Sequence, residues 1–178
     1  MGEIQKLIQE VAKSRYAYLA QVINVSEEQS KWKPEANSWN ITEITEHLFW
    51  AEHAGIFGMW KRLQAIRTKE VTRTYDFEHK DRTIEQIIEM TWQSKEKVPE
   101  VANPRMGGPL SFWLVSLSSL QEVLASFGNE LQEEELRLKA QAHPISGDLD
   151  FHQRFEFLRF HIERHTEQTR LLLTKMNG

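Results

Sequence analysis

Four long segments of this 178-residue chain carry apolar residues every three or four positions, the spacing of one face of an α-helix. The two-residue alternation typical of half-buried β-strands is almost absent. The sequence therefore predicts an all-α protein, a single-domain four-helix bundle over residues 1–178, with long crossover connections and an extra short helix. The predicted long helices cover residues from about 3 to 23, 41 to 67, 110 to 127 and 151 to 175.

Local signals define several helix ends. Asn40, followed three residues later by Glu43, forms a capping-box signature at the start of the second long helix. The pair Gly128-Asn129 is expected to end the third long helix. The extra short helix is expected from Ile84 to about residue 97. A long irregular crossing, rich in proline and glycine, then leads to the third long helix.

Charge and composition exclude several classes of protein. The net charge is −4 and the 22 lysines and arginines are dispersed, which disfavours nucleic-acid binding. No apolar segment marks the N-terminus, and no apolar run approaches the length that spans a bilayer, so we expect a soluble cytoplasmic protein without membrane contact. The acidic run 133–135 is expected to be a solvated face. Because there is no cysteine, a metal site must use histidine and carboxylate.

Two histidines occupy the inner face of the last predicted helix. His161 and His165 are four residues apart, so they lie on one side of the helix, separated by about 40° around its axis. Both can bind one metal ion, although such a pair is also found as ordinary hydrogen-bonded core or surface residues. Their seam has the spacing of a buried face and consists of Leu158, His161, His165, Gln168 and Leu172.

His47 is the candidate for a third ligand, because it lies on the inner face of the second long helix. Three imidazoles would leave coordination positions open, as in catalytic rather than structural sites. His53 lies about 120° around the helix from His47, and His152 is on the opposite side of its helix from the ligand pair. We interpret both as surface or packing residues, and we expect His79 to be solvated.

Two known metal patterns are excluded by spacing. A zincin needs glutamate directly after its first histidine, but Ile162 follows His161. A di-iron carboxylate site needs glutamate three residues before its histidines, yet these positions hold Ile44, Leu158 and Ile162. A dinuclear site is therefore not expected.

Several short motifs occur in a characteristic order along the chain. They are Trp32-Lys33-Pro34, Ser38-Trp39-Asn40-Ile41, Glu46-His47-Leu48 with Glu52, His143-Pro144-Ile145-Ser146-Gly147-Asp148-Leu149 and His161-x3-His165-x2-Gln168. Their order and spacing resemble those of the DinB/YfiT-like metal-binding four-helix bundles. The resemblance extends over most of the chain, although residues 68 to 110 carry no motif of the family. It implies a divalent metal bound by His47, His161 and His165.

Members of this family include S-transferases that use low-molecular-weight thiols, a thiol-dependent maleylpyruvate isomerase type and proteins described as metal-dependent hydrolases. The resemblance therefore implies a small-molecule substrate and a metal that activates a low-molecular-weight thiol. Zinc or nickel are the expected ions, with iron as a further candidate. A hydrolase, a non-catalytic metal-binding or stress-response protein, and a plain helical interaction module remain alternatives. A homodimer is also expected from the resemblance.

Polar and aromatic residues near the predicted ligands have open roles. Gln168 either bonds a ligand or pairs with the backbone, and the sequence favours the backbone. Glu43 is expected to cap its helix rather than to orient His47. Trp60 and Trp92 either form a substrate wall or a dimer interface, or belong to the core.

Overall fold

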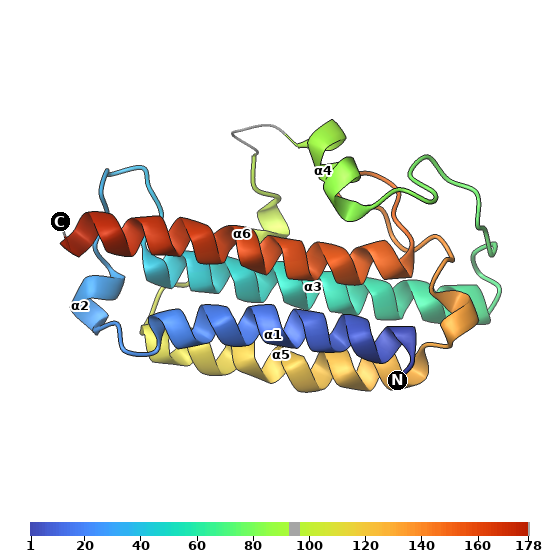
Figure 1. The fold of residues 1–178 in the computed structure, drawn as a ribbon, viewed down its shortest axis with the longest axis horizontal. Coiled ribbons are helices and arrows are strands. Elements are labelled where there is room, and N and C mark those ends of the chain that lie inside the picture. Colours follow the sequence, from blue (N-terminus) through green and yellow to red (C-terminus); the bar gives the residue numbers. More distant parts are fainter. Residues whose placement is uncertain (93–96, 178) are drawn as a thin grey trace.

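The computed structural model describes residues 1–92 and 97–177, and helices dominate it (Figure 1). Within these residues no β-strand forms, and only the isolated bridges Lys139–Asp150 and His143–Gly147 occur. The prediction of an all-helical protein is confirmed. The helices are α1 (Glu3–Val22), α2 (Glu27–Ser30), α3 (Ile41–Arg67), α4 (Ile84–Thr91), α5 (Leu110–Glu130) and α6 (Phe151–Asn177), with two 3₁₀ turns, η1 (Glu100–Ala102) and η2 (Glu133–Glu135).

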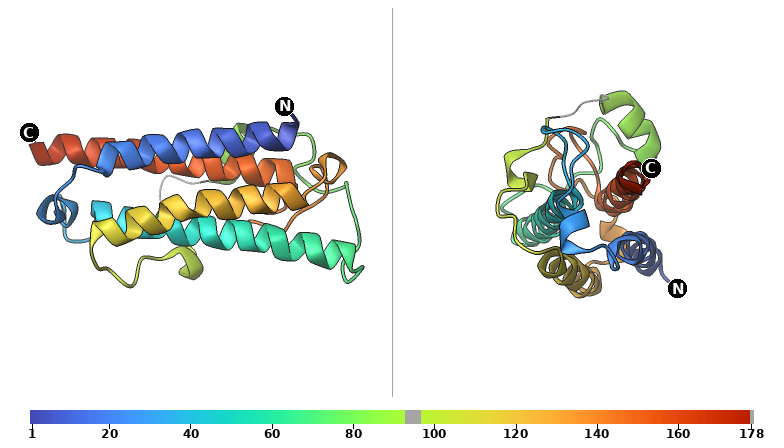
Figure 2. Two further views of the ribbon diagram at one scale, coloured as in Figure 1. Left: turned by 90° about the horizontal axis from the view of Figure 1, so that it is seen from below. Right: turned by 90° about the vertical axis from the view of Figure 1, so that its left-hand side faces the viewer.

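The four long helices lie side by side with their apolar faces turned inward (Figure 2). Helix α1 packs against α5 and α6, and α3 packs against α5 and α6. Helices α1 and α6 run in one direction and α3 and α5 in the other (Figure 1). Because α3 and α5 run in the same direction, the chain between them, residues 68–109, must travel back along the molecule. That long connection carries α4, which contacts α6, and η1, which contacts α3.

Some helix ends agree with those predicted from the sequence, and others do not. Helix α3 begins with the predicted capping box, in which Asn40 and Glu43 each bond the other's backbone N–H. The predicted stop at Gly128 is wrong, because α5 continues to Glu130. A Cβ at Gly128 would overlap Ile8 on α1, so this glycine permits close helix packing instead. Helix α4 ends at Thr91 and Trp92 is already extended, so the helix is shorter than the predicted span to about residue 97, of which residues 93–96 lie outside the described residues.

Two groups expected in solvent are buried. His79 is only 2% exposed, because Gln153 on α6 donates to its carbonyl oxygen at 2.8 Å and fixes the connection against that helix. Glu135, in the acidic run, is buried as well and pairs with Arg67 at 2.8 Å. Both contacts join segments far apart in the sequence. The polarity of the neighbouring residues therefore wrongly predicted that His79 and Glu135 are exposed to solvent.

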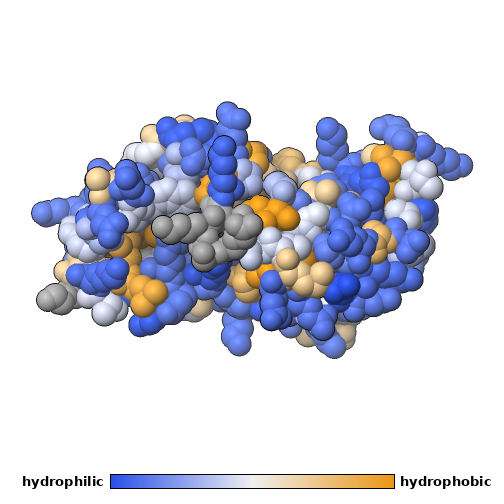
Figure 3. Space-filling view, turned by 90° about the horizontal axis from the view of Figure 1, so that it is seen from above, coloured by the Kyte–Doolittle hydropathy of each residue, from blue (hydrophilic) through white to orange (hydrophobic). Residues whose placement is uncertain are grey.

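Helix α5 is long and apolar enough to cross a membrane by length and composition, contrary to the expectation that no such run exists. In the most apolar 18-residue stretch of this helix, 39% is buried. The helix is apolar on two sides because it packs against both α1 and α3. The same test is met by core helices of soluble proteins, and the structure is compatible with a soluble protein. Charged and polar residues cover much of the face shown in Figure 3, with apolar patches between them.

Candidate metal centre

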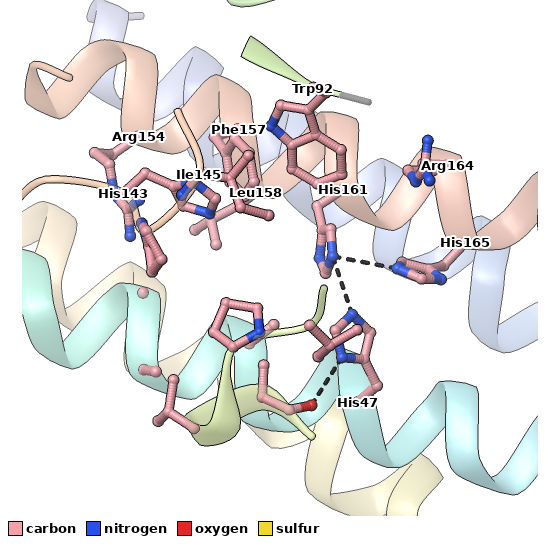
Figure 4. A pocket seen from close by; sticks show the side chains of 18 of the residues that line it. His47, Trp92, His143, Ile145, Arg154, Phe157, Leu158, His161, Arg164 and His165 are labelled. Carbon is pink, nitrogen blue, oxygen red and sulfur yellow. Dashed lines mark hydrogen bonds between the residues drawn. The ribbon is translucent and has the colours of Figure 1, made fainter. Parts of the chain in front are cut away.

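Three histidines from two helices converge in the space between α3 and α6 (Figure 4). The Nε2 atom of His161 lies 3.1 Å from Nε2 of His47 and 3.2 Å from Nε2 of His165. One donor atom from each lies within 4.8 Å of the others, and all three side chains are buried. The structure thus brings together the three histidines that the sequence singled out.

The outer nitrogens of two of these rings are held by oxygen acceptors. Nδ1 of His47 donates to the carbonyl oxygen of Ala102 at 2.8 Å. Nδ1 of His165 donates to Oε1 of Gln168 at 2.7 Å. An oxygen without a hydrogen can only accept, so each ring carries its proton on Nδ1 and turns the Nε2 lone pair inward. Gln168 therefore contacts a candidate ligand, rather than the backbone as the sequence favoured.

Two of the three nitrogen–nitrogen distances match those between ligands of a single metal ion. Two nitrogens that each lie about 2.1 Å from an ion are about 3.0 Å apart at a right angle and about 3.4 Å apart at the tetrahedral angle. The two Nε2 distances, 3.1 and 3.2 Å, fall within this range. No aspartate or glutamate belongs to this group among the residues the structure describes. The donor set therefore fits a divalent ion that accepts imidazole and keeps positions open.

The environment of the three rings keeps them neutral. Burial lowers the pKa of His47 to about 4, although the Ala102 carbonyl acts in the opposite direction. Burial, and then the electrostatic effect of the His47 ring, lowers the pKa of His165 to about 3. The pKa of His161 is lowered well below its usual value, first by burial and then by the neighbouring histidines. Neutral imidazole is the form that binds metal.

Glu46 fixes the backbone that supports His47. Its carboxylate is buried and accepts the backbone N–H groups of Arg105, Met106 and Gly107 at 2.7, 2.8 and 2.9 Å. Burial raises the pKa of Glu46, but these donors outweigh it and the pKa is lowered. The anchored segment follows η1, which supplies the Ala102 carbonyl. In the sequence, Glu46 stands out only as part of a motif. No local signal predicts that its carboxylate anchors the backbone at 105–107.

The three histidines line one end of a pocket with a volume of about 290 Å³. Figure 4 shows His143 and Arg154 toward the other end of this pocket, with Phe157 between them and His161. Trp92 lines the pocket as well, as expected for a wall residue. The remaining lining residues are mostly small or apolar and come from α3, the segment 98–102, α6 and the turn at 141–145. Trp39, before α3, and Arg164, on α6, line the pocket as well.

The other candidate residues lie away from the pocket. His53 stacks on Phe57, with ring centroids 4.5 Å apart. His152 lies 3.0 Å from the carboxylate of Glu3 and 3.3 Å from that of Glu156. Trp60 is exposed on α3. The interpretation of His53 and His152 as packing or surface residues agrees with these contacts.

Comparisons with known proteins show similarity in fold only. A crystal structure of a conserved protein from Enterococcus faecalis is similar, with a TM-score of 0.55 and 12% sequence identity, over 97% of this chain and 95% of that one. No protein-family model matches the chain. No curated protein matches it. At this identity the likeness shows that the helical arrangement is shared and carries no information on activity.

Proposed function

We propose that this protein is a metal-dependent enzyme of the DinB/YfiT-like four-helix-bundle kind. In this proposal a divalent ion, zinc or nickel with iron as a further candidate, binds to His47, His161 and His165 and activates a low-molecular-weight thiol. The observation that carries the proposal is the convergence of three Nε2 atoms at the wall of a pocket large enough for a small molecule.

A divalent ion at this position supplies a Lewis acid that lowers the pKa of a thiol or of water. The protein holds the ligand rings in place through the Ala102 carbonyl and Gln168. Aromatic residues limit the access of water, since Trp39 packs on His47 at a centroid distance of 4.8 Å and Phe157 stacks on His161 at 5.7 Å.

The chain has no cysteine, so the thiol in this proposal comes from a separate molecule. The pocket favours turnover over a purely structural ion, because structural sites are closed by four protein ligands. A hydrolase that activates water at the same site is the second candidate, since the same open position would serve it. We further propose a cytoplasmic homodimer that acts on a small molecule.

Elemental analysis of purified wild type beside His161→Ala tests the proposal first. We expect near-stoichiometric metal in the wild type and little in His161→Ala, with His152→Ala as a matched control on the same helix that keeps its metal. The metal-loaded protein is then assayed for consuming small thiols with a generic electrophile. Metal bound without thiol consumption would favour the hydrolase or a non-catalytic protein, and wild type that takes up no metal after reloading would refute the proposal.

A further inference from the structure

Arg154 is a buried charged side chain in the pocket without a partner. The residue is 6% exposed, and its Nε and Nη1 atoms form no hydrogen bond. Among the described residues no carboxylate pairs with its guanidinium, and burial alone lowers its pKa to about 10. The group therefore keeps its charge at neutral pH. A buried charge without a partner is destabilising, which calls for a functional reason.

The described surroundings of Arg154 leave room for a ligand but provide no anion. No aspartate or glutamate is among the residues of 1–92 and 97–177 that line the pocket. Besides His47 at the metal end, α3 contributes three small residues to the pocket lining, Ala51, Ala54 and Gly55. Even a methyl group at Gly55 would approach Nη2 of Arg154 to 3.5 Å and Leu158 to 3.2 Å. The glycine thus keeps free the space beside the guanidinium.

His143 provides a second donor in the same pocket. Its Nδ1 atom accepts the backbone N–H groups of Ile145 and Ser146 at 3.2 and 3.0 Å. Its proton is therefore on Nε2, which makes that atom a neutral N–H donor. The ring lies on Phe157, with centroids 4.1 Å apart, and the guanidinium of Arg154 lies 5.8 Å from the centroid of the same Phe157 ring. The two donors thus share one wall of the pocket.

The geometry of α6 separates this cationic end from the three histidines. Arg154 and His161 are seven residues apart, which places them on one face of the helix at an axial distance of about 10 Å. Apolar side chains, Phe157, Leu158 and Ile145, line the pocket between them (Figure 4). A ligand that fills the pocket would have an anionic end, an apolar middle and a reactive end.

We propose that Arg154 and His143 bind a carboxylate of the small molecule on which the site acts, while its reactive end lies two helical turns away at the three histidines. This inference rests on the proposed function for the identity of the reactive end. Among the described residues, Arg154 has the one guanidinium at this end of the pocket, since the other lining arginine, Arg164, lies over Trp92. A carboxylate is favoured over a phosphate because its single negative charge balances that guanidinium, whereas a dianion would leave an uncompensated charge.

The test uses two thiols of equal length, 6-mercaptohexanoate and neutral 6-mercaptohexan-1-ol, titrated into zinc-loaded protein by calorimetry. We expect wild type to bind the acid roughly 10- to 100-fold more tightly than the alcohol, the usual contribution of a charge-assisted hydrogen bond. In Arg154→Met this preference should vanish. Arg170→Met is the matched control, because Arg170 lies on the same helix, exposed and paired with Glu167 away from the pocket, and it should keep the preference.

The melting temperature of the ligand-free variants separates binding from a structural role. Arg154→Met removes an unpaired buried charge and should melt higher than wild type. If Arg154 instead shares a buried water with the unpaired Oε1 of Gln141, the variant should melt lower and bind both thiols like wild type, which would overturn the inference. Equal affinity of wild type for acid and alcohol would also overturn it.

Hexanoate distinguishes failure of this inference from failure of the proposed function. It carries the carboxylate without the thiol, so it should raise the melting temperature of wild type and of metal-deficient His161→Ala, but not of Arg154→Met. This result would support the carboxylate site even if no metal chemistry were found. Binding of 6-mercaptohexan-1-ol without any effect of hexanoate would refute the carboxylate site and leave the metal proposal intact.

Discussion

We expect single residues outside the proposed ligand set to tune how well the three imidazoles bind a metal. Gln168 is exposed, yet its Oε1 accepts the Nδ1 proton of His165. The Ala102 carbonyl does the same for His47. Acceptors of this kind fix the ring orientation and raise the basicity of the metal-binding nitrogen. Of the two, only Gln168 has a side chain that mutation can remove.

Gln168→Ala should lower metal affinity by about 10- to 100-fold, the usual effect of losing such a partner. Gln168→Glu should retain affinity, because a carboxylate also accepts the Nδ1 proton. Competition with a chromophoric chelator measures both affinities. Glu167→Ala, an exposed neighbour, is the control. Unchanged affinity in Gln168→Ala would show that the ring needs no acceptor.

Glu52 and Arg15 form a buried ion pair between α3 and α1. Burial raises the pKa of Glu52, and the charge and hydrogen bonds of Arg15 oppose this. Glu52→Gln should lower the free energy of unfolding by about 3–5 kcal/mol, because it leaves the Arg15 charge buried and unpaired. The double variant Arg15→Met/Glu52→Leu should recover most of that loss. Urea denaturation measures both, and a double variant no more stable than Glu52→Gln would contradict this account.

Among whole elements, those with local signals could be predicted and those fixed by distant contacts could not. The start of α3 was predictable because Asn40 and Glu43 bond within one turn. The end of α5 was not, because Gly128 has the sequence appearance of a helix stop, and its real neighbour is Ile8 on α1. Helix α2 was missed because it is only one turn long, although Ser26 and Gln29 form its capping box.

Gly128→Ala tests this close approach of α1 and α5. Alanine in a helix interior stabilises the helix by about 0.5–1 kcal/mol relative to glycine. The added methyl would overlap Ile8, however, and overpacking costs about 1–3 kcal/mol. We therefore expect a net loss in the free energy of unfolding, measured with urea, in the wild-type background. In an Ile8→Ala background, where the overlapping side chain is gone, Gly128→Ala should cause no such loss. A gain in stability in Gly128→Ala alone would show that the helices separate easily.

Across the whole molecule, the candidate site could be predicted where it depends on helical spacing. His161 and His165 share a helix face, and His47 lies on the inner face of α3, so both features are periodic in the sequence. The pocket around them could not be predicted, because residues 68–109 have no long periodic segment. Their position depends on tertiary contacts such as those from Glu46 to the backbone at 105–107.

Buried histidines of the pocket should make the stability of the whole protein depend on pH. Burial, and then the charge of Arg154, lowers the pKa of His143 to about 3. In the unfolded chain this pKa is about 6.5. As the pH falls below 6.5, the unfolded state takes up the proton first, so the free energy of unfolding decreases. Each such histidine contributes about 1.4 kcal/mol per pH unit until the pH reaches the folded pKa.

Metal-free wild type should therefore lose stability steadily from pH 6.5 to 5, where few carboxylates titrate, since His47 and His165 add to the effect of His143. His143→Leu should lose less, by about 1.4 kcal/mol per pH unit, because one proton uptake is removed. Urea denaturation at several pH values in the presence of a chelator measures both slopes. Equal slopes would mean that His143 is solvated and charged in the folded protein, and the neutral donor assigned to the pocket would be wrong.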